Sequence, residues 1–183
     1  MTRPRVVIIG GGFAGLTAAR GLRKADVDVT LLDRTNHHLF QPLLYQVATA
    51  VLSPSDISSP IRWLLRKQTN TTVLMAEVDR IDVDARRVIA DGGRVSVDYD
   101  YLVIAAGARH AYFGHDEWEP DAPGLKSLED ARTIRDRFLR AFEEAEKAVD
   151  AETQAGWLHF VIVGGGPTGV ELAGILPDIA HHS

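Results

Sequence analysis

The sequence of 183 residues contains no cysteine. Disulfide bonds, thiolate metal sites and redox-active thiols are therefore excluded over these residues, and the absence fits a cytoplasmic protein. No apolar run approaches the roughly 18 residues that a membrane-spanning helix needs. An apolar strand begins directly after Arg5, so we expect no signal peptide. The formal net charge is −5 and there is no basic stripe, so we expect no nucleic-acid partner.

Residues 6–16 join an apolar run to a glycine-rich turn. The run Val-Val-Ile-Ile is typical of a buried parallel strand, and Gly10, Gly12 and Gly15 form the pattern G-x-G-x-x-G. Gly10 allows a tight turn, Gly12 lets a diphosphate approach the backbone, and Gly15 lets the next helix pack closely on the strand. The N-terminus of that helix carries roughly half a positive charge. The segment therefore predicts a dinucleotide-binding site.

An acidic residue follows the second predicted strand, residues 27–32. Asp33 lies 23 residues after Gly10 (33 − 10), close to the spacing of about 20 expected for the acid that hydrogen-bonds a ribose 2′-hydroxyl. A carboxylate there should also repel the 2′-phosphate of NADP, although the neighbouring Arg34 weakens that exclusion. The alternative is that Asp33 only ends the strand.

The glycine pattern is repeated 154 residues later (164 − 10). Residues 160–170 again give an apolar strand, the glycines Gly164, Gly166 and Gly169, and the start of a helix. Two such motifs in one chain indicate two dinucleotide sites. They favour electron transfer between two cofactors over simple binding.

Further strands are predicted between the two motifs. Residues 71–83 are predicted as one strand, and a hairpin signal at 91–93 indicates an inserted antiparallel β-meander. Residues 101–105 are predicted as another buried strand. This strand ends at Ala106 and Gly107, where small residues let the backbone approach a ligand.

The helices complete the expected fold. A capping box at Ser127 and Asp130 predicts a long helix that reaches about Val149. Pro177 is expected to end or kink the helix after the second motif. The order of elements predicts an α/β chain, with a Rossmann-like domain that carries the meander, followed by the start of a second Rossmann-like domain.

Residues 35–46 are aromatic and apolar but begin with a polar turn. They leave the ligand side of the predicted sheet, so they either line a pocket for a flat ring or form a loop and short helix that fill the core. His37 and His38 are adjacent and point in opposite directions in an extended chain. Neither they nor His181 and His182 have partners at metal-ligand spacing, so we predict no metal site.

The chain resembles the N-terminal part of a type II NADH dehydrogenase, a flavoprotein with two dinucleotide-binding domains. The glycine motifs are shared by many flavoproteins, whereas their combination with Phe-Gln-Pro-Leu-Leu at 40–44 is more specific. The resemblance implies an FAD-binding domain at 1–110. It assigns 111–183 to a linker, a long helix and the incomplete start of an NAD(H)-binding domain. The matching segments are 10–15, 38–44, 99–107, 122–126 and 164–174.

The same resemblance assigns the first motif to FAD and the second to NADH. Val78 would meet the adenine through its backbone, and residues 40–44 would lie against the flavin ring. The FAD-binding residues would be Gly10, Gly12, Phe13, Ala14, Gly15, Asp33, Arg34, Gln41, Pro42, Leu43, Val78, Ala106 and Gly107. The NADH-binding residues would be Gly164, Gly166, Pro167, Thr168 and Gly169.

Glu171 is the one candidate catalytic residue. It corresponds to Thr17 of the first motif and is expected in the first turn of its helix. A carboxylate there is stabilised by the helix dipole by roughly 0.3–1 kcal/mol, which is reason enough for its presence. It would also repel an NADH diphosphate, so it must face elsewhere, and the resemblance favours a role in substrate handling. Both interpretations stay open.

Members of this family transfer a hydride from NADH to the flavin and then reduce a membrane quinone of the respiratory chain. They are peripheral on the inner face of the cell membrane, through a C-terminal part that these residues do not include. We therefore expect residues 1–183 alone to be inactive and to self-associate through the apolar segment 160–163. Three alternatives are a non-catalytic FAD- or nucleotide-binding module from a truncated product, a disulfide-reducing flavoprotein and a sulfide-oxidising flavoprotein. The absence of cysteine speaks against the last two.

Overall fold

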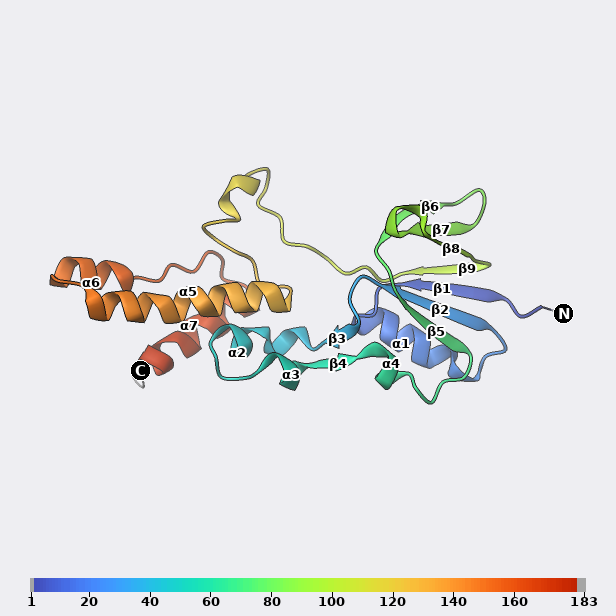
Figure 1. The fold of residues 1–183 in the computed structure, drawn as a ribbon, viewed down its shortest axis with the longest axis horizontal. Helices are drawn as coiled ribbons and strands as arrows, with labels where there is room; N and C mark the ends of the chain where they lie inside the picture. Colours follow the sequence, from blue (N-terminus) through green and yellow to red (C-terminus); the bar gives the residue numbers. More distant parts are fainter. Residues whose placement is uncertain (1, 181–183) are drawn as a thin grey trace. The chain divides into compact units, whose positions relative to one another are not determined.

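The computed structural model describes residues 2–180 (Figure 1). Two compact units make up the chain. The first unit is the segment that ends at Leu39 together with Ser58–Ala108, and the second is Phe40–Ile57 together with the chain from Arg109 onward. Each unit is described by itself.

The first unit is built on a four-stranded parallel sheet in the order β5-β2-β1-β9. A three-stranded antiparallel meander follows in the order β6-β7-β8, and β3 pairs with β4 in a separate antiparallel ribbon. The predicted α/β fold with an inserted meander is confirmed. The strands are β1 Arg5–Ile9, β2 Asp28–Asp33, β3 His37–Leu39, β4 Ser58–Pro60, β5 Thr71–Met75, β6 Val78–Asp82, β7 Arg87–Ala90, β8 Val95–Asp98 and β9 Tyr101–Ile104. The helices are α1 Phe13–Gly21, η1 Leu22–Lys24, α4 Ile61–Leu64 and η3 Asp91–Gly93.

Both faces of the parallel sheet are covered. Along β1, Val6 and Ile8 pack against α1 and α4, whereas Val7 and Ile9 pack against the meander. Figure 1 shows the meander above the sheet and α1 below it. Because successive side chains of a strand point to opposite faces, burial on both faces requires the continuous apolar run that the sequence contains. This three-layer packing fixes the strand ends that carry the first glycine motif.

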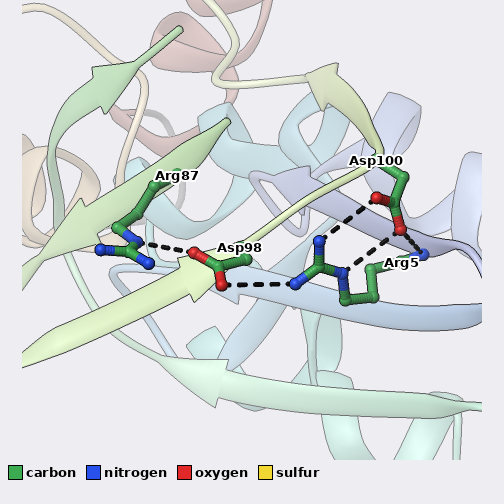
Figure 2. Close-up of polar contacts among 4 residues, drawn as sticks. All are labelled: Arg5, Arg87, Asp98 and Asp100. Atoms are coloured by element: carbon green, nitrogen blue, oxygen red, sulfur yellow. Dashed lines mark hydrogen bonds and ion pairs between the residues drawn. The ribbon is translucent and has the colours of Figure 1, made fainter. Parts of the chain in front are cut away.

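A network of exposed charges joins the meander to the parallel sheet (Figure 2). The Arg5 guanidinium lies 3.2 Å from Asp100 and 3.3 Å from Asp98, and Arg87 lies 2.6 Å from Asp98. Hydrogen bonds from Arg87 lower the pKa of Asp98, and hydrogen bonds from Arg5 lower the pKa of Asp100. Arg5 is in β1 while Asp98 ends β8, so the network connects the two sheets.

Two strand predictions in this unit are wrong in detail. The single strand expected at 71–83 is divided into β5 and β6, because the chain leaves one sheet for the other at the buried Ala76. The strand β9 is not buried throughout, since Tyr101 is 63% exposed and Ile104 67% exposed. Among the described residues β9 pairs only with β1, so it forms an edge of the sheet.

The second unit is helical. Its elements are η2 Gln41–Leu43, α2 Leu44–Ala48, α3 Pro54–Ile57, η4 Asp116–Trp118, α5 Leu128–Lys147, α6 Ala151–Trp157 and α7 Pro167–Ala180. The predicted capping box is confirmed: the Ser127 hydroxyl accepts from the Asp130 N–H at 3.1 Å, and Asp130 accepts from the Ser127 N–H at 2.9 Å. The helix α5 packs against α2 and α6. None of the helices within residues 2–180 is long and apolar enough to cross a membrane.

An apolar cavity of about 450 Å³ lies in the second unit. The rings of Phe138, Phe142 and Phe160 cluster there, with centroids 5.0–6.0 Å apart. The lining residues are Phe138, Phe142, Leu158, Phe160, Ile162, Ala173, Leu176, Pro177 and Ala180.

One prediction fails in this unit. Residues 160–163 form no strand, because no strand of the described residues pairs with them. Pro177 was expected to end or kink its helix; it does not end α7, which continues to Ala180. A proline this near a helix end removes one hydrogen bond of the last turns, and the helix tolerates the loss. The helix α5 ends at Lys147, close to the expected end at about Val149.

Candidate nucleotide-binding site

The turn after β1 needs glycine for the two reasons that the sequence predicts. Gly10 has a φ of +101°, and its N–H donates to the Leu32 carbonyl at 2.7 Å. A Cβ at Gly10 would overlap the Ala105 carbonyl, and a Cβ at Gly15 would overlap the Gly10 carbonyl. The tight turn and the close approach of α1 to β1 are therefore both present.

Gly12 borders open space. Its backbone is ordinary, with φ −71° and ψ −162°, and a Cβ there would meet no atom within 4 Å. Its carbonyl accepts from the Leu16 N–H at 3.0 Å, whereas its N–H donates to no group among residues 2–180. A backbone N–H at a helix N-terminus is a good donor to an anion. The turn therefore fits the diphosphate of a dinucleotide.

Asp33 ends β2, as predicted, and its carboxylate has three partners. Oδ2 accepts from the Gly11 N–H at 2.5 Å, and Oδ1 accepts from both the N–H and the hydroxyl of Thr35 at 2.7 Å. A carboxylate has about four acceptor positions. One position thus remains for a ribose hydroxyl, and Asp33 does more than end a strand.

His38 was missed by the sequence reasoning. Its Nδ1 lies 3.0 Å from the Gly11 carbonyl oxygen, and its ring meets the edge of Phe13 with centroids 5.1 Å apart. His37 points elsewhere, with its Nδ1 3.4 Å from the Asn36 side chain. Its position in the sequence could have predicted this contact, because His38 follows β2 and β2 ends at the same sheet edge as the glycine turn.

Several predicted residues lie at this edge. Gly10 follows β1, Asp33 ends β2 and Gly107 follows β9, and these strands are neighbours in the sheet order β2-β1-β9. Gly107 has a φ of +76° and open space around it, and Ala106 beside it is exposed. The exposed residues Phe13, Ala14 and Arg34 lie in α1 or directly after β2. Val78 begins β6 and pairs with Ala90.

Residues 40–44 belong to the second unit. Gln41 and Pro42 are exposed and lie in η2 with the half-buried Leu43, and the Gln41 amide donates to the Lys126 carbonyl at 3.4 Å. Leu44 is 2% exposed and begins α2, which packs against α5. Locally the segment is a loop followed by short helices, and of its residues only Leu44 is buried in the second unit.

The second glycine turn has the same backbone as the first. Gly164 has a φ of +104°, and a Cβ at Gly169 would overlap the Gly164 carbonyl. The Val170 N–H donates to the Gly166 carbonyl at 3.1 Å, as Leu16 does to Gly12. Space around Gly166 is open, and α7 begins at Pro167, a favourable first position for proline. The second motif therefore has its turn and its helix, but among the described residues no sheet supports it.

Glu171 was expected in the first turn of its helix but lies directly after that turn. The helix α7 begins at Pro167 and has no acidic residue in its first turn, because Glu171 is its fifth residue. The dipole effect falls off beyond the first turn, so helix stabilisation no longer accounts for this carboxylate. Glu171 is half-buried, and it forms no hydrogen bond or ion pair with residues 2–180.

No cluster of three metal-ligating side chains occurs among residues 2–180. His181 and His182 lie outside the described residues.

Comparisons with known proteins agree with this geometry. The family described as pyridine nucleotide-disulphide oxidoreductase matches residues 4–183. The type II NADH:quinone oxidoreductase Ndh of Mycobacterium tuberculosis is 51% identical over 99% of the chain, which spans only 40% of that relative. The expected resemblance is thereby confirmed.

Solved structures of oxidoreductases also match the fold of this chain. The structure of NDH2 from Plasmodium falciparum in complex with NADH matches with a TM-score of 0.83 and 30% identity, over 93% of this chain and 36% of that one. The sulfide:quinone oxidoreductase of Aquifex aeolicus matches with a TM-score of 0.69 and 30% identity, over 76% and 32% of the two chains. The chain belongs to the pyridine nucleotide-disulphide oxidoreductase family.

Proposed function

We propose that these residues are the nucleotide-binding part of a type II NADH:quinone oxidoreductase, with FAD at the first glycine turn and NADH at the second. The observation that carries the proposal is the pair of turns with one backbone geometry, in which Gly10 and Gly164 have φ values of +101° and +104°. Two such turns suit an enzyme that passes electrons between two dinucleotides. The names of the similar proteins supply the substrates NADH and quinone.

Each residue has a task in this proposal. The Gly12 N–H and the N-terminus of α1 hold the FAD diphosphate, and Asp33 accepts from the ribose. When bound, FAD supplies the redox chemistry, accepting electrons from NADH and passing them on to quinone. Gly166, with Pro167, Thr168 and Gly169 at the start of α7, holds NADH. Quinones are membrane lipids, so we place the whole protein in the cytoplasm, peripherally on the membrane.

The loops after β5 and β9 contribute to the proposed FAD site of the first unit. Val78 lies beside the adenine, and Ala106 and Gly107 allow a close approach of the cofactor. Arg34 contacts FAD in this assignment. The family resemblance assigns Gln41, Pro42 and Leu43 to the flavin ring. Glu171 remains the candidate for substrate handling, since nothing in α7 accounts for it.

Cysteine chemistry separates this proposal from its nearest alternative. Disulfide reduction and sulfide oxidation by flavoproteins use cysteine thiols, and residues 1–183 contain none. The likeness to a sulfide:quinone oxidoreductase therefore supports the fold and the nucleotide sites, without the sulfur chemistry.

A pair of matched variants tests the assignment of FAD to the first turn. Gly12→Val places a branched side chain where the diphosphate must lie, and the ordinary φ of Gly12 lets the variant fold. We expect Gly12→Val to lose FAD binding while its circular dichroism is unchanged. Gly166→Val makes the same change in the second turn and should leave FAD affinity intact. An FAD-loaded, yellow Gly12→Val protein would refute the assignment.

A further inference from the structure

The middle residue of the first glycine turn is held from both sides. Gly11 is buried, and its N–H donates to Asp33 Oδ2 at 2.5 Å. Its carbonyl oxygen lies 3.0 Å from His38 Nδ1. Both polar groups of Gly11 therefore pair with side chains, one at the end of β2 and the other in β3.

The tautomer of His38 follows from this contact. A carbonyl oxygen only accepts hydrogen bonds, so Nδ1 must carry the hydrogen. The edge of Phe13 lies against the imidazole ring, with centroids 5.1 Å apart and planes 86° apart. The backbone of His38 is fixed by the pairing of β3 with β4, where His38 lies opposite Ser59. The ring is therefore held in one orientation against the turn.

The planarity of the peptide bond links His38 to the ligand side of the turn. The Gly11 carbonyl and the Gly12 N–H belong to one trans peptide, so they point in opposite directions. Fixing the carbonyl toward His38 thus directs the Gly12 N–H away from it. That N–H has no partner among residues 2–180, and the space around Gly12 is open.

We propose that His38 is a positioning residue of the phosphate-binding turn: its Nδ1–H holds the Gly11 carbonyl so that the Gly12 N–H faces the diphosphate of the dinucleotide. The hydrogen bond also polarises the shared peptide, which makes the Gly12 N–H a stronger donor. Without His38, the buried carbonyl loses its partner and the peptide is free to rotate. This inference rests on the proposed function, because it takes FAD as the ligand.

The test compares three variants of the full chain. His38→Leu removes the donor, whereas His38→Asn keeps an amide N–H close to the place of Nδ1. His37→Leu is the matched control, because His37 does not contact the turn. FAD and ADP are titrated into each protein, and the backbone N–H signals are followed by NMR, which also measures weak binding. We expect His38→Leu to weaken both ligands by about tenfold, and His38→Asn and His37→Leu to stay close to wild type.

Two ligand-free readouts separate this inference from the proposed function. Nitrogen NMR should show a hydrogen on Nδ1 of His38, and the Gly12 amide signal should shift in His38→Leu but not in His37→Leu. If both NMR results are as expected but wild type binds neither FAD nor ADP, the proposed function is refuted. The role of His38 in orienting the Gly12 peptide is then still supported. If wild type binds but His38→Leu binds equally well, or His38→Asn is as weak as His38→Leu, the role of His38 is refuted.

Discussion

Asp33 holds the glycine turn and keeps one acceptor position that we propose for a ligand. Its carboxylate accepts from Gly11 and twice from Thr35, which holds the end of β2 against the glycine turn. The remaining acceptor position faces no donor among residues 2–180. A ribose hydroxyl that binds there meets a carboxylate whose orientation is already fixed, so little entropy is lost on binding.

Replacing Asp33 should therefore affect FAD affinity strongly. In Asp33→Ala the ribose loses an acceptor in a charge-assisted hydrogen bond, worth about 1.5–3 kcal/mol, so we expect affinity to fall by roughly 10- to 100-fold. Titration of the apo-protein with FAD measures this. Asp28→Ala, at the other end of β2, is the control and should bind as wild type does. An unchanged affinity of Asp33→Ala would remove Asp33 from the site.

At the scale of single residues, spacing predicted the backbone of the turn: Gly10 allows the tight turn and Gly15 the close approach of α1. The roles of Gly12 and Asp33 toward a ligand stay predictions. Spacing could not predict the contacts of His38 or Thr35. Their contacts depend on where the chain goes after β2 and on which side of β3 each side chain lies. If the pairing of β3 with β4 were shifted by one residue, His37 would face the glycine turn in place of His38.

Among the structural elements, the meander depends on the charges that connect it to β1. Arg5, Asp98, Asp100 and Arg87 form a chain of ion pairs between the two sheets (Figure 2). The pKa values of both aspartates are lowered by their arginine partners. A carboxyl group with a lowered folded-state pKa stabilises the fold above its unfolded pKa of about 3.9. That stabilisation is lost as the pH falls through the folded value.

We therefore expect Asp98→Asn to be less stable than wild type at pH 7, by a small amount because the groups are exposed. The difference should disappear as the pH falls through the lowered folded-state pKa of Asp98, because the carboxylate of the wild type is then itself protonated. Urea unfolding at several pH values measures this. Asp84→Asn, which removes an exposed carboxylate without partners in the described residues, is the control and should show no such trend. A difference that stays the same from pH 7 down to the acid end of the titration would contradict the ion-pair explanation.

Local signals predicted those elements that form from neighbours in sequence. The capping box at Ser127 set the start of α5, and the hairpin around 91–93 appears as β7 and β8. Elements that depend on distant partners were less predictable. Residues 71–83 divide at Ala76 because the two halves join different sheets, and residues 160–163 form no strand because their partner is missing among the described residues.

For the whole molecule, the two glycine turns differ in their support. The first turn lies on a four-stranded sheet whose two faces are buried. The second follows an unpaired segment in which Val161 is 75% exposed and Val163 81% exposed. The chain spans 40% of the M. tuberculosis relative.

A polypeptide limited to residues 1–183 should therefore not sustain NADH oxidation. The spacing from Gly10 to Asp33, applied from Gly164, places the second ribose acid at position 187 (164 + 23), beyond these residues. NADH would be held by the N-terminus of α7 alone, and the exposed apolar segment 160–163 should favour self-association. The assay is NADH oxidation with a soluble quinone and added FAD, with free FAD as the control. We expect the rate to equal that of free FAD. Sustained turnover well above it would show that the polypeptide completes its second site, for example by pairing the segments 160–163 of two copies.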